Sequence, residues 1–328
     1  MLRLPDPMDY YAGMVFPEPN YIEANGIRMA VYEQGQGKPV IFLHGFPELA
    51  YSWRHQLPAL AAAGYRAIAP DMRGFGRTEV PTKVEDYTAE ILVADMLGLL
   101  DALQLESAIF VGHDWGALTL WHMAMLKPQR MDGLIALNIP HIRRPPADPV
   151  ELMRQRFGDD FYIVNFQDSD EADRLFQSDP RHFLNMMMRK KQLTREQFER
   201  LPAEHQVLSL LQTARRSTGS GEPLLNEKEL DYFEEAYRIS GFSGAIHRYR
   251  NWSLNWERLA GVDETIRIPT LFIGARDDVV VSLQQIEAMK KLVPDLELHV
   301  LDDCGHWSQQ ERPDAVNQLM LDWLVKRG

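Results

Sequence analysis

The chain has 328 residues, of which 45% are hydrophobic and 25% are charged, and Cys304 is its single cysteine. The formal net charge of -12 at pH 7, without a basic run, argues against a nucleic-acid partner or an anionic membrane surface, because like charges repel. One thiol excludes an internal disulfide, and the sequence contains neither a signal peptide nor an apolar stretch long enough to span a membrane. We therefore expect a globular cytoplasmic protein.

The first 140 residues alternate short apolar runs with segments of helical periodicity. An Asn25-Gly26 turn precedes the first clear strand, and Thr88 is a suitable N-cap for the first long helix. Strands that alternate with helices indicate a parallel sheet covered by helices on both faces. The predicted strands are 27–33, 40–43, 66–69, 108–111 and 133–137, and the predicted helices are 88–103 and one that begins at about 117.

The pattern changes after Pro140, where the run RRPP at 143–146 interrupts the alternation. Up to about Ala260 the sequence is typical of amphipathic helices; strands return at 270–273 and 296–300, before a last helix over 315–325. We predict an α/β-hydrolase fold with a core of residues 1–140 and 264–328 and an inserted helical cap of residues 141–263. Such a cap would cover the carboxyl ends of the strands, where ligands bind in sheets of this type.

Residues 112–116 read GHDWG and join a predicted strand to a predicted helix. This is the form of a nucleophile elbow, in which small residues flank the nucleophile because the turn is too tight for a β-carbon. Aspartate, Asp114, stands where most enzymes with this motif have serine. The alternative is an ordinary turn in which Asp114 is the N-cap of the helix.

An aspartate at the elbow selects the reaction. A carboxylate that attacks a saturated carbon forms an ester, which water can hydrolyse, whereas a serine would form an ether that resists water. The carboxylate also needs no base to activate it, because it is ionised at neutral pH. Asp114 therefore predicts displacement at an sp³ carbon, either of an epoxide ring or of a carbon–halogen bond.

Hydrolysis of that ester requires a base. His306 follows the last predicted strand and Asp277-Asp278 follow the strand over 270–273, so the order nucleophile, acid, histidine is that of the hydrolases. We predict that His306 deprotonates the water and that Asp277, three residues after Gly274, holds the histidine. Asp278 is the competing residue for the second role.

A glycine-containing loop follows the strand over 40–43, where residues 44–47 read HGFP. We expect this loop to place the backbone N–H of Phe46 near the nucleophile. Together with the N–H of Trp115, it would form the oxyanion hole for hydrolysis of the ester. Taken alone, the sequence HGFP is also typical of an ordinary glycine-containing loop at the end of a strand.

Four segments together resemble the soluble epoxide hydrolases: HGFP at 44–47, DMRGFG at 71–76, GHDWG at 112–116 and CGHW at 304–307. The likeness covers nearly the whole chain after about Asn20 and implies a small-molecule epoxide as the substrate. One departure is the segment 277–282, which lacks the proline that the family often has there. Mammalian members carry an additional N-terminal domain, which we do not expect in this chain.

The resemblance also implies two tyrosines in the cap that point their hydroxyls at the epoxide oxygen. The segment DFYIVNFQ at 160–167 nominates Tyr162, and HRYRNW at 247–252 nominates Tyr249. Ring opening leaves an alkoxide, and phenols with a reference pKa of about 10 can stabilise it by hydrogen bonding or proton donation.

Two other functions remain open. A haloalkane or haloacid dehalogenase would share the nucleophile, acid and histidine, with the Trp115 indole as a halide donor. Against it, Phe46 stands where haloalkane dehalogenases commonly have a polar residue, and no arginine follows Asp114 within the elbow to bind a substrate carboxylate. The more remote alternative is a non-catalytic ligand-binding protein of the same fold.

The histidines show no ligand-like spacing, and no phosphate-binding loop is present in the sequence. We therefore predict no metal and no cofactor. The sequence does not distinguish a monomer from a homodimer, and it does not identify the physiological epoxide or the enantio- and regioselectivity.

Overall fold

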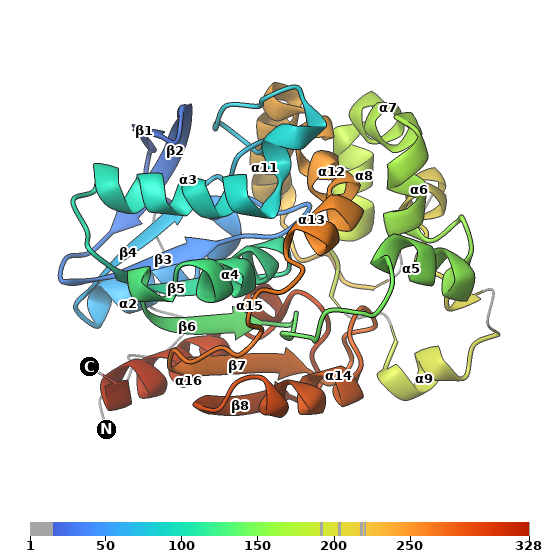
Figure 1. The fold of residues 1–328 in the computed structure, drawn as a ribbon. Coiled ribbons are helices and arrows are strands. Elements are labelled where there is room, and N and C mark those ends of the chain that lie inside the picture. Colours follow the sequence, from blue (N-terminus) through green and yellow to red (C-terminus); the bar gives the residue numbers. More distant parts are fainter. Residues whose placement is uncertain (1–15, 191–192, 203–204, 217–218, 220, 328) are drawn as a thin grey trace.

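The computed structural model describes residues 16–190, 193–202, 205–216, 219 and 221–327 (Figure 1). The strands are β1 (Asn20–Ala24), β2 (Ile27–Gln34), β3 (Lys38–Leu43), β4 (Tyr65–Pro70), β5 (Ala108–His113), β6 (Met131–Leu137), β7 (Thr270–Ala275) and β8 (Leu296–Leu301). Within the described residues they form an eight-stranded sheet in the order β1-β2-β4-β3-β5-β6-β7-β8. The pairs β1/β2 and β2/β4 are antiparallel and the others are parallel, which confirms the predicted mostly parallel sheet.

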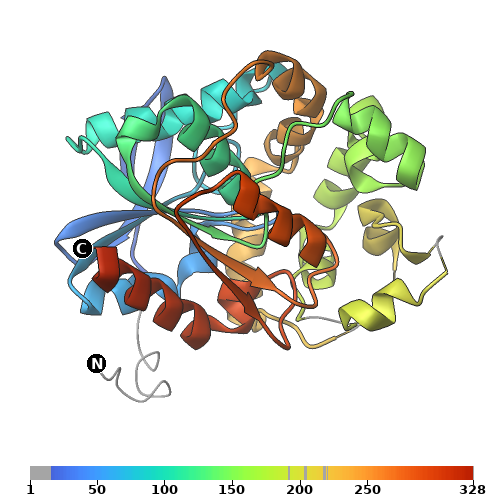
Figure 2. The ribbon, with the colours of Figure 1, turned by 60° about the horizontal axis from the view of Figure 1, so that its bottom comes forward.

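Helices cover both faces of the sheet (Figure 1, Figure 2). α3 (Ala89–Ala102) and α4 (Trp115–Leu126) pack in the same hydrophobic cluster as Ile41 and Leu43 of β3. α2 (Gln56–Ala62) and α16 (Pro313–Arg327) pack in a second cluster with Val40 and Phe42. Alternate residues of one strand thus enter opposite layers, as the twofold periodicity of a strand requires. The short elements of the core are η1 (Ala50–Trp53), η2 (Val84–Tyr87), η3 (Pro128–Arg130), α14 (Leu283–Ala288), η5 (Met289–Lys291) and α15 (Ser308–Glu311).

The carboxyl ends of four neighbouring parallel strands lie at one edge of the sheet. The register pairs Leu43 with Gly112, His113 with Leu137, and Leu137 with Ile273. The last residues of β3, β5, β6 and β7 are therefore nearly level. As a consequence, the loops that carry the predicted site residues leave the sheet side by side.

The chain between β6 and β7 is helical, as predicted. Its helices, which we call the cap, lie beyond the carboxyl ends of the parallel strands (Figure 1). Between residues 138 and 269, the described chain shows one isolated bridge, Arg189 with Pro223, and no named strand. The boundaries at 141 and 263 stay a prediction. The cap helices are α5 (Pro149–Phe157), α6 (Tyr162–Asp168), α7 (Glu171–Ser178), α8 (Pro180–Met187), α9 (Arg195–Glu199), α10 (Leu210–Arg215), α11 (Glu227–Ser240), α12 (Ser243–Arg250) and α13 (Trp252–Arg258).

No helix in the described part of the chain combines the length and the apolarity that crossing a bilayer requires.

The start of α3 differs from the expectation. Thr88 occupies the N-cap position, but its side chain accepts no capping hydrogen bond. Instead, Oδ1 of Asn255, from the cap, accepts the backbone N–H of Ala89 at 2.8 Å. A residue 166 positions away thus caps the helix, and this bond joins the cap to the core.

We expect Asn255→Ala to lower the free energy of unfolding by about 1–2 kcal/mol, because it removes a helix cap and leaves the buried Ala89 N–H without its acceptor. Thr88→Val removes a hydroxyl that has no hydrogen-bond partner among the described residues, so it should leave that free energy nearly unchanged. Urea denaturation followed by circular dichroism measures both. A greater loss for the valine variant than for the alanine variant would contradict this account.

Candidate active site

Asp114 occupies a tight turn between β5 and α4. Its φ of 50° and ψ of -118° lie in a region that residues other than glycine rarely adopt. A β-carbon on Gly112 would lie 2.6 Å from the nitrogen of Ala117, and one on Gly116 would lie 2.0 Å from the carbonyl oxygen of Leu43. Only glycines therefore fit on both sides of the turn. The Asp114 side chain makes no capping hydrogen bond to α4, so the geometry is that of the elbow.

The HGFP loop lies directly against Asp114. A β-carbon on Gly45 would lie 2.4 Å from Cβ of Asp114, so a larger residue would push the loop away. The backbone N–H of Phe46 donates to Oδ1 of Asp114 at 3.0 Å. Trp115, the second predicted oxyanion donor, is the first residue of α4, where N–H groups have no acceptor within the helix. Both predicted donors are thus adjacent to the carboxylate, Phe46 through a hydrogen bond and Trp115 through the chain.

His306 faces two carboxylates. Its Nδ1 lies 3.0 Å from Oδ2 of Asp278, and its Nε2 lies 3.6 Å from Oδ2 of Asp114. The prediction of Asp277 as the partner is therefore wrong, because the Asp277 carboxylate accepts the backbone N–H of Arg195 at 3.0 Å. The chain turns immediately after β7, so the two adjacent aspartates face different elements: Asp277 faces α9, and Asp278 faces the histidine.

Asp278 is held by two further donors. Nδ2 of Asn138 donates to its Oδ2 at 2.8 Å, and the N–H of Val280 donates to its Oδ1 at 2.9 Å. Burial favours the neutral acid, but His306 and these donors outweigh burial and lower the pKa of Asp278. The Asp278 carboxylate is therefore ionised beside the histidine at neutral pH.

The charges of Asp114 and His306 depend on each other. Burial would raise the pKa of Asp114, but the neighbouring His306 and the Phe46 N–H lower it. Burial would lower the pKa of His306, but Asp278 and Asp114 together raise it well above the usual range. In the free protein at neutral pH, a protonated histidine therefore lies between two carboxylates.

A buried polar network lies behind these residues. Nδ1 of His113 lies 2.7 Å from Oε2 of Glu48, and Nε2 of His113 lies 2.7 Å from the carbonyl oxygen of His306. Oε1 of Glu48 accepts hydrogen bonds from the side-chain amides of Gln309 at 2.6 Å and Gln310 at 3.0 Å. The network joins the HGFP loop, the elbow and the loop of His306, so a shift in one of the three is resisted by the other two.

Tyr162 and Tyr249 come from two different cap helices, α6 and α12; Tyr249 packs against Trp115, and Tyr162 packs against Tyr249. The ring centroids of the two tyrosines are 5.7 Å apart, and those of Tyr249 and Trp115 are 4.8 Å apart. Burial, and after it the negative charge of Asp114, raises the pKa of both phenols. Both tyrosines therefore stay protonated next to the carboxylate. The side-chain amide of Gln167 donates to the carbonyl oxygen of Tyr249 at 2.9 Å and joins the two helices.

Comparisons with known proteins agree with this geometry. A family model described as alpha/beta hydrolase fold matches residues 38–313. The chain is 37% identical to Epoxide hydrolase A of Mycobacterium tuberculosis, over 94% of this chain and 98% of that protein, and 38% identical to Epoxide hydrolase 2 of Siraitia grosvenorii, over 93% and 97%. The crystal structure of Epoxide Hydrolase A from Mycobacterium thermoresistibile matches with a TM-score of 0.85 at 37% identity, over 94% of this chain and 98% of that one.

The chain belongs to the epoxide hydrolase family of the α/β-hydrolase superfamily. The resemblance found in its motifs is thereby confirmed, and so is the predicted fold.

In this epoxide hydrolase, sequence reasoning missed Glu48, His113 and Asn138. Glu48 directly follows the HGFP segment, and His113 lies inside the GHDWG segment. Those two segments were interpreted for Phe46, Asp114 and Trp115 only. Asn138 follows β6 with a φ of 65° and bonds Asp278 across 140 residues of sequence. The sequence contained one hint of this role: Asn138 directly follows the predicted strand over 133–137. Asparagine is one of the few residues that tolerate a positive φ, as a turn at the end of a strand can require.

Asp278→Asn should lower the pKa of His306, because it removes the negative charge nearest to the ring, whereas Asp277→Asn should leave that pKa unchanged. The histidine of the Asp278 variant would then lose its proton at a lower pH than in the parent enzyme. NMR titration of the imidazole resonances measures both variants. A larger shift in Asp277→Asn than in Asp278→Asn would contradict the assignment of Asp278 as the partner of His306.

Proposed function

We propose that this enzyme converts an epoxide and water to a vicinal diol through a covalent ester on Asp114. One observation carries the proposal: the aspartate at the elbow has a lowered pKa, and its charge acts on two protonated cap tyrosines. A nucleophile and two proton donors are the groups that opening an epoxide requires. Membership of the family supports an epoxide as the substrate.

Ring opening would use both sides of the site. Oδ1 of Asp114 is held by the Phe46 N–H, which leaves Oδ2 to attack an epoxide carbon. The new C–O bond forms the ester as the C–O bond of the ring breaks. The oxygen that leaves the carbon takes a proton from Tyr162 or Tyr249, because an alkoxide is more basic than a phenolate.

The ester then converts His306 into a base. The charge of Asp114 helps to raise the pKa of His306, and esterification removes that charge, so the pKa should fall. The histidine can then return a proton to the phenolate and become neutral. It remains bonded to Asp278, which keeps its Nε2 directed at the ester.

Hydrolysis completes the cycle. Neutral His306 takes a proton from water, and the resulting hydroxide attacks the carboxyl carbon of the ester. The N–H groups of Phe46 and Trp115 stabilise the oxyanion that forms. When the bond between this carbon and the ester oxygen (the former Oδ2 of Asp114) breaks, that oxygen takes the remaining carboxyl proton and leaves as a hydroxyl of the diol. Asp114 is again an anion and His306 a cation.

The cap tyrosines favour the epoxide over a carbon–halogen bond. The pKa of both phenols is raised, so Tyr162 and Tyr249 keep their protons beside the Asp114 carboxylate. A protonated phenol can donate to an acceptor in the substrate. This arrangement suits a leaving group that needs a proton, as an alkoxide does and a halide does not.

A single turnover in water enriched in ¹⁸O tests the covalent step, with styrene oxide as the probe and enzyme in excess. We expect an unlabelled diol and a labelled peptide containing Asp114, because the first hydroxyl derives from the carboxylate. His306→Gln should accumulate the ester as a mass adduct on that peptide, and Asp114→Ala should bind the epoxide without forming diol.

Label in the diol of the first turnover would refute the ester. A parallel assay with a chloroalkane addresses the alternative function: release of chloride without formation of diol from the epoxide would identify a dehalogenase.

Tyr162→Phe and Tyr249→Phe should each slow the formation of the ester by about 10- to 100-fold, and the double variant by about 1,000-fold or more, because each removes a proton donor to the alkoxide. Rapid-quench measurement of the adduct gives this rate. Tyr232→Phe is a matched control, because this cap tyrosine donates its hydroxyl to Tyr32 instead. If all three substitutions slowed the formation of the ester equally, the cause would be a general disturbance of the cap and not the loss of a proton donor.

A further inference from the structure

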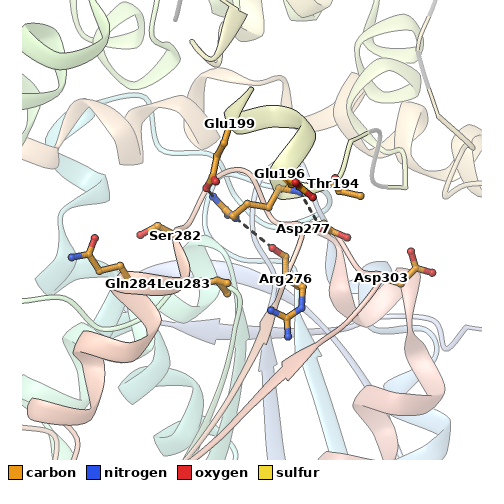
Figure 3. A pocket seen from close by; sticks show the side chains of 10 residues that line it. Thr194, Glu196, Glu199, Arg276, Asp277, Ser282, Leu283, Gln284 and Asp303 are labelled. Carbon is orange, nitrogen blue, oxygen red and sulfur yellow. Dashed lines mark hydrogen bonds and ion pairs between the residues drawn. The ribbon is translucent and has the colours of Figure 1, made fainter. Parts of the chain in front are cut away.

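A cleft of about 700 Å³ separates cap helix α9 from the chain that follows β7 (Figure 3). Glu196 and Glu199 line it from α9, and Asp277 and Ser282 line it from the other side. Figure 3 shows these side chains facing each other across the gap. The side of the cleft opposite α9 belongs to the segment that also carries Asp278, the partner of His306. A shift of this segment would therefore move the carboxylate that supports the proposed base.

Arg195 crosses the cleft and holds that wall. Its Nη2 donates to the carbonyl oxygens of Asp278 and Val281, and its Nε donates to the carbonyl oxygen of Arg276 at 3.4 Å. Its backbone N–H donates to the Asp277 carboxylate at 3.0 Å. One residue of the cap thus bonds four groups of the segment 276–281, and its side chain is only 15% exposed.

The segment 276–281 depends on such bonds. It contains no proline, so no residue in it has a fixed φ, and its conformation must come from hydrogen bonds. The N–H groups of Arg276 and Asp277 bond the carbonyl oxygens of Leu301 at 2.9 Å and Cys304 at 3.0 Å, whereas the bond from the Asp278 N–H to the carbonyl oxygen of Ala275 is long at 3.4 Å, so the backbone is held less firmly from Asp278 onward. Bonds from a guanidinium are charge-assisted and about twice as strong as neutral ones, and a planar fork fixes their directions.

We propose that Arg195 is a positioning residue for the base: by bridging the carbonyl oxygens of Asp278 and Val281, it holds the Asp278 carboxylate against His306. This inference rests on the proposed function, because it assigns Arg195 to the step in which His306 activates water. The cap then contributes to both steps, through its tyrosines to ring opening and through Arg195 to hydrolysis of the ester.

The two contributions come from opposite parts of the cap and are separable. Tyr249 is tied to the core on its own side: its neighbour Arg248 donates to the carbonyl oxygen of Arg73 at 2.8 Å, and Asn251 donates to that of Val84 at 2.6 Å. Loss of the Arg195 bonds leaves these ties in place. The formation of the ester should therefore be spared while its hydrolysis slows.

Arg195→Ala tests the inference, with styrene oxide as the probe and rapid quench followed by mass spectrometry of the Asp114 peptide. We expect the rate of ester formation to stay within about twofold of the parent enzyme. Hydrolysis of the ester and kcat should fall about tenfold or more, since small displacements of a catalytic group are costly, and the ester should accumulate. Arg195→Lys, which keeps the charge but not the fork, should give an intermediate rate of hydrolysis.

Arg200→Ala is the matched control. Arg200 follows α9 directly, its side chain is 75% exposed, and it pairs with Glu196 rather than with the core. This variant should form and hydrolyse the ester at the rates of the parent enzyme.

Hydrolysis at the parent rate in Arg195→Ala would overturn the inference, as would an equal fall of both rates in that variant. If the alanine variant does not fold, the lysine variant decides, and hydrolysis at the parent rate would again overturn it. His306→Gln separates this failure from that of the proposed function. If the adduct accumulates in His306→Gln but not in the Arg195 variants, the role of Arg195 is rejected and the ester is retained. If no variant accumulates an adduct, both the ester and the role of Arg195 are rejected.

Discussion

The carboxylate of Asp114 has to stay ionised while protein nearly encloses it. Burial alone would favour the neutral acid, and a neutral acid would be a poor nucleophile. The N–H of Phe46 and the imidazolium of His306 compensate for the lost water, and each of them needs its own support. Phe46 can approach because residue 45 is glycine, and His306 is charged because Asp278 lies on its other side. Much of the site thus serves to keep one anion stable and available.

The same anion sets the state of the cap tyrosines. Burial and the negative charge of Asp114 together keep the phenols of Tyr162 and Tyr249 protonated, so the proposed nucleophile and its proposed proton donors have compatible charge states before a substrate arrives. In the proposed mechanism, the core supplies the anion and the base, and the cap supplies the proton donors. Bonds between core and cap, such as that from Ala89 to Asn255, therefore bear on the chemistry as well as on stability.

Much of the fold and most of the site could be predicted from residues near each other in the sequence. The strands of the core follow from apolar runs, and the elbow follows from glycines on both sides of Asp114. One prediction was wrong and one was incomplete, and both have the same cause. Asp277 was preferred to Asp278, and Thr88, which does occupy the N-cap position of α3, makes no capping bond with its side chain. Both predictions used only neighbouring residues. The groups that decide these positions, Asn138 and Asn255, lie far away in the chain.

The sequence by itself determined the alternation of strands and helices, the elbow and the position of Asp114 at its centre, because periodicity and backbone sterics act over a few residues. Only the tertiary structure decided which of two adjacent aspartates supports His306 and where the other one points. The direction of a side chain after a strand depends on the path of the turn. Asn138, directly after β6, and Arg195 of the cap both bond residues of this turn, and these partners become neighbours only when the chain has folded.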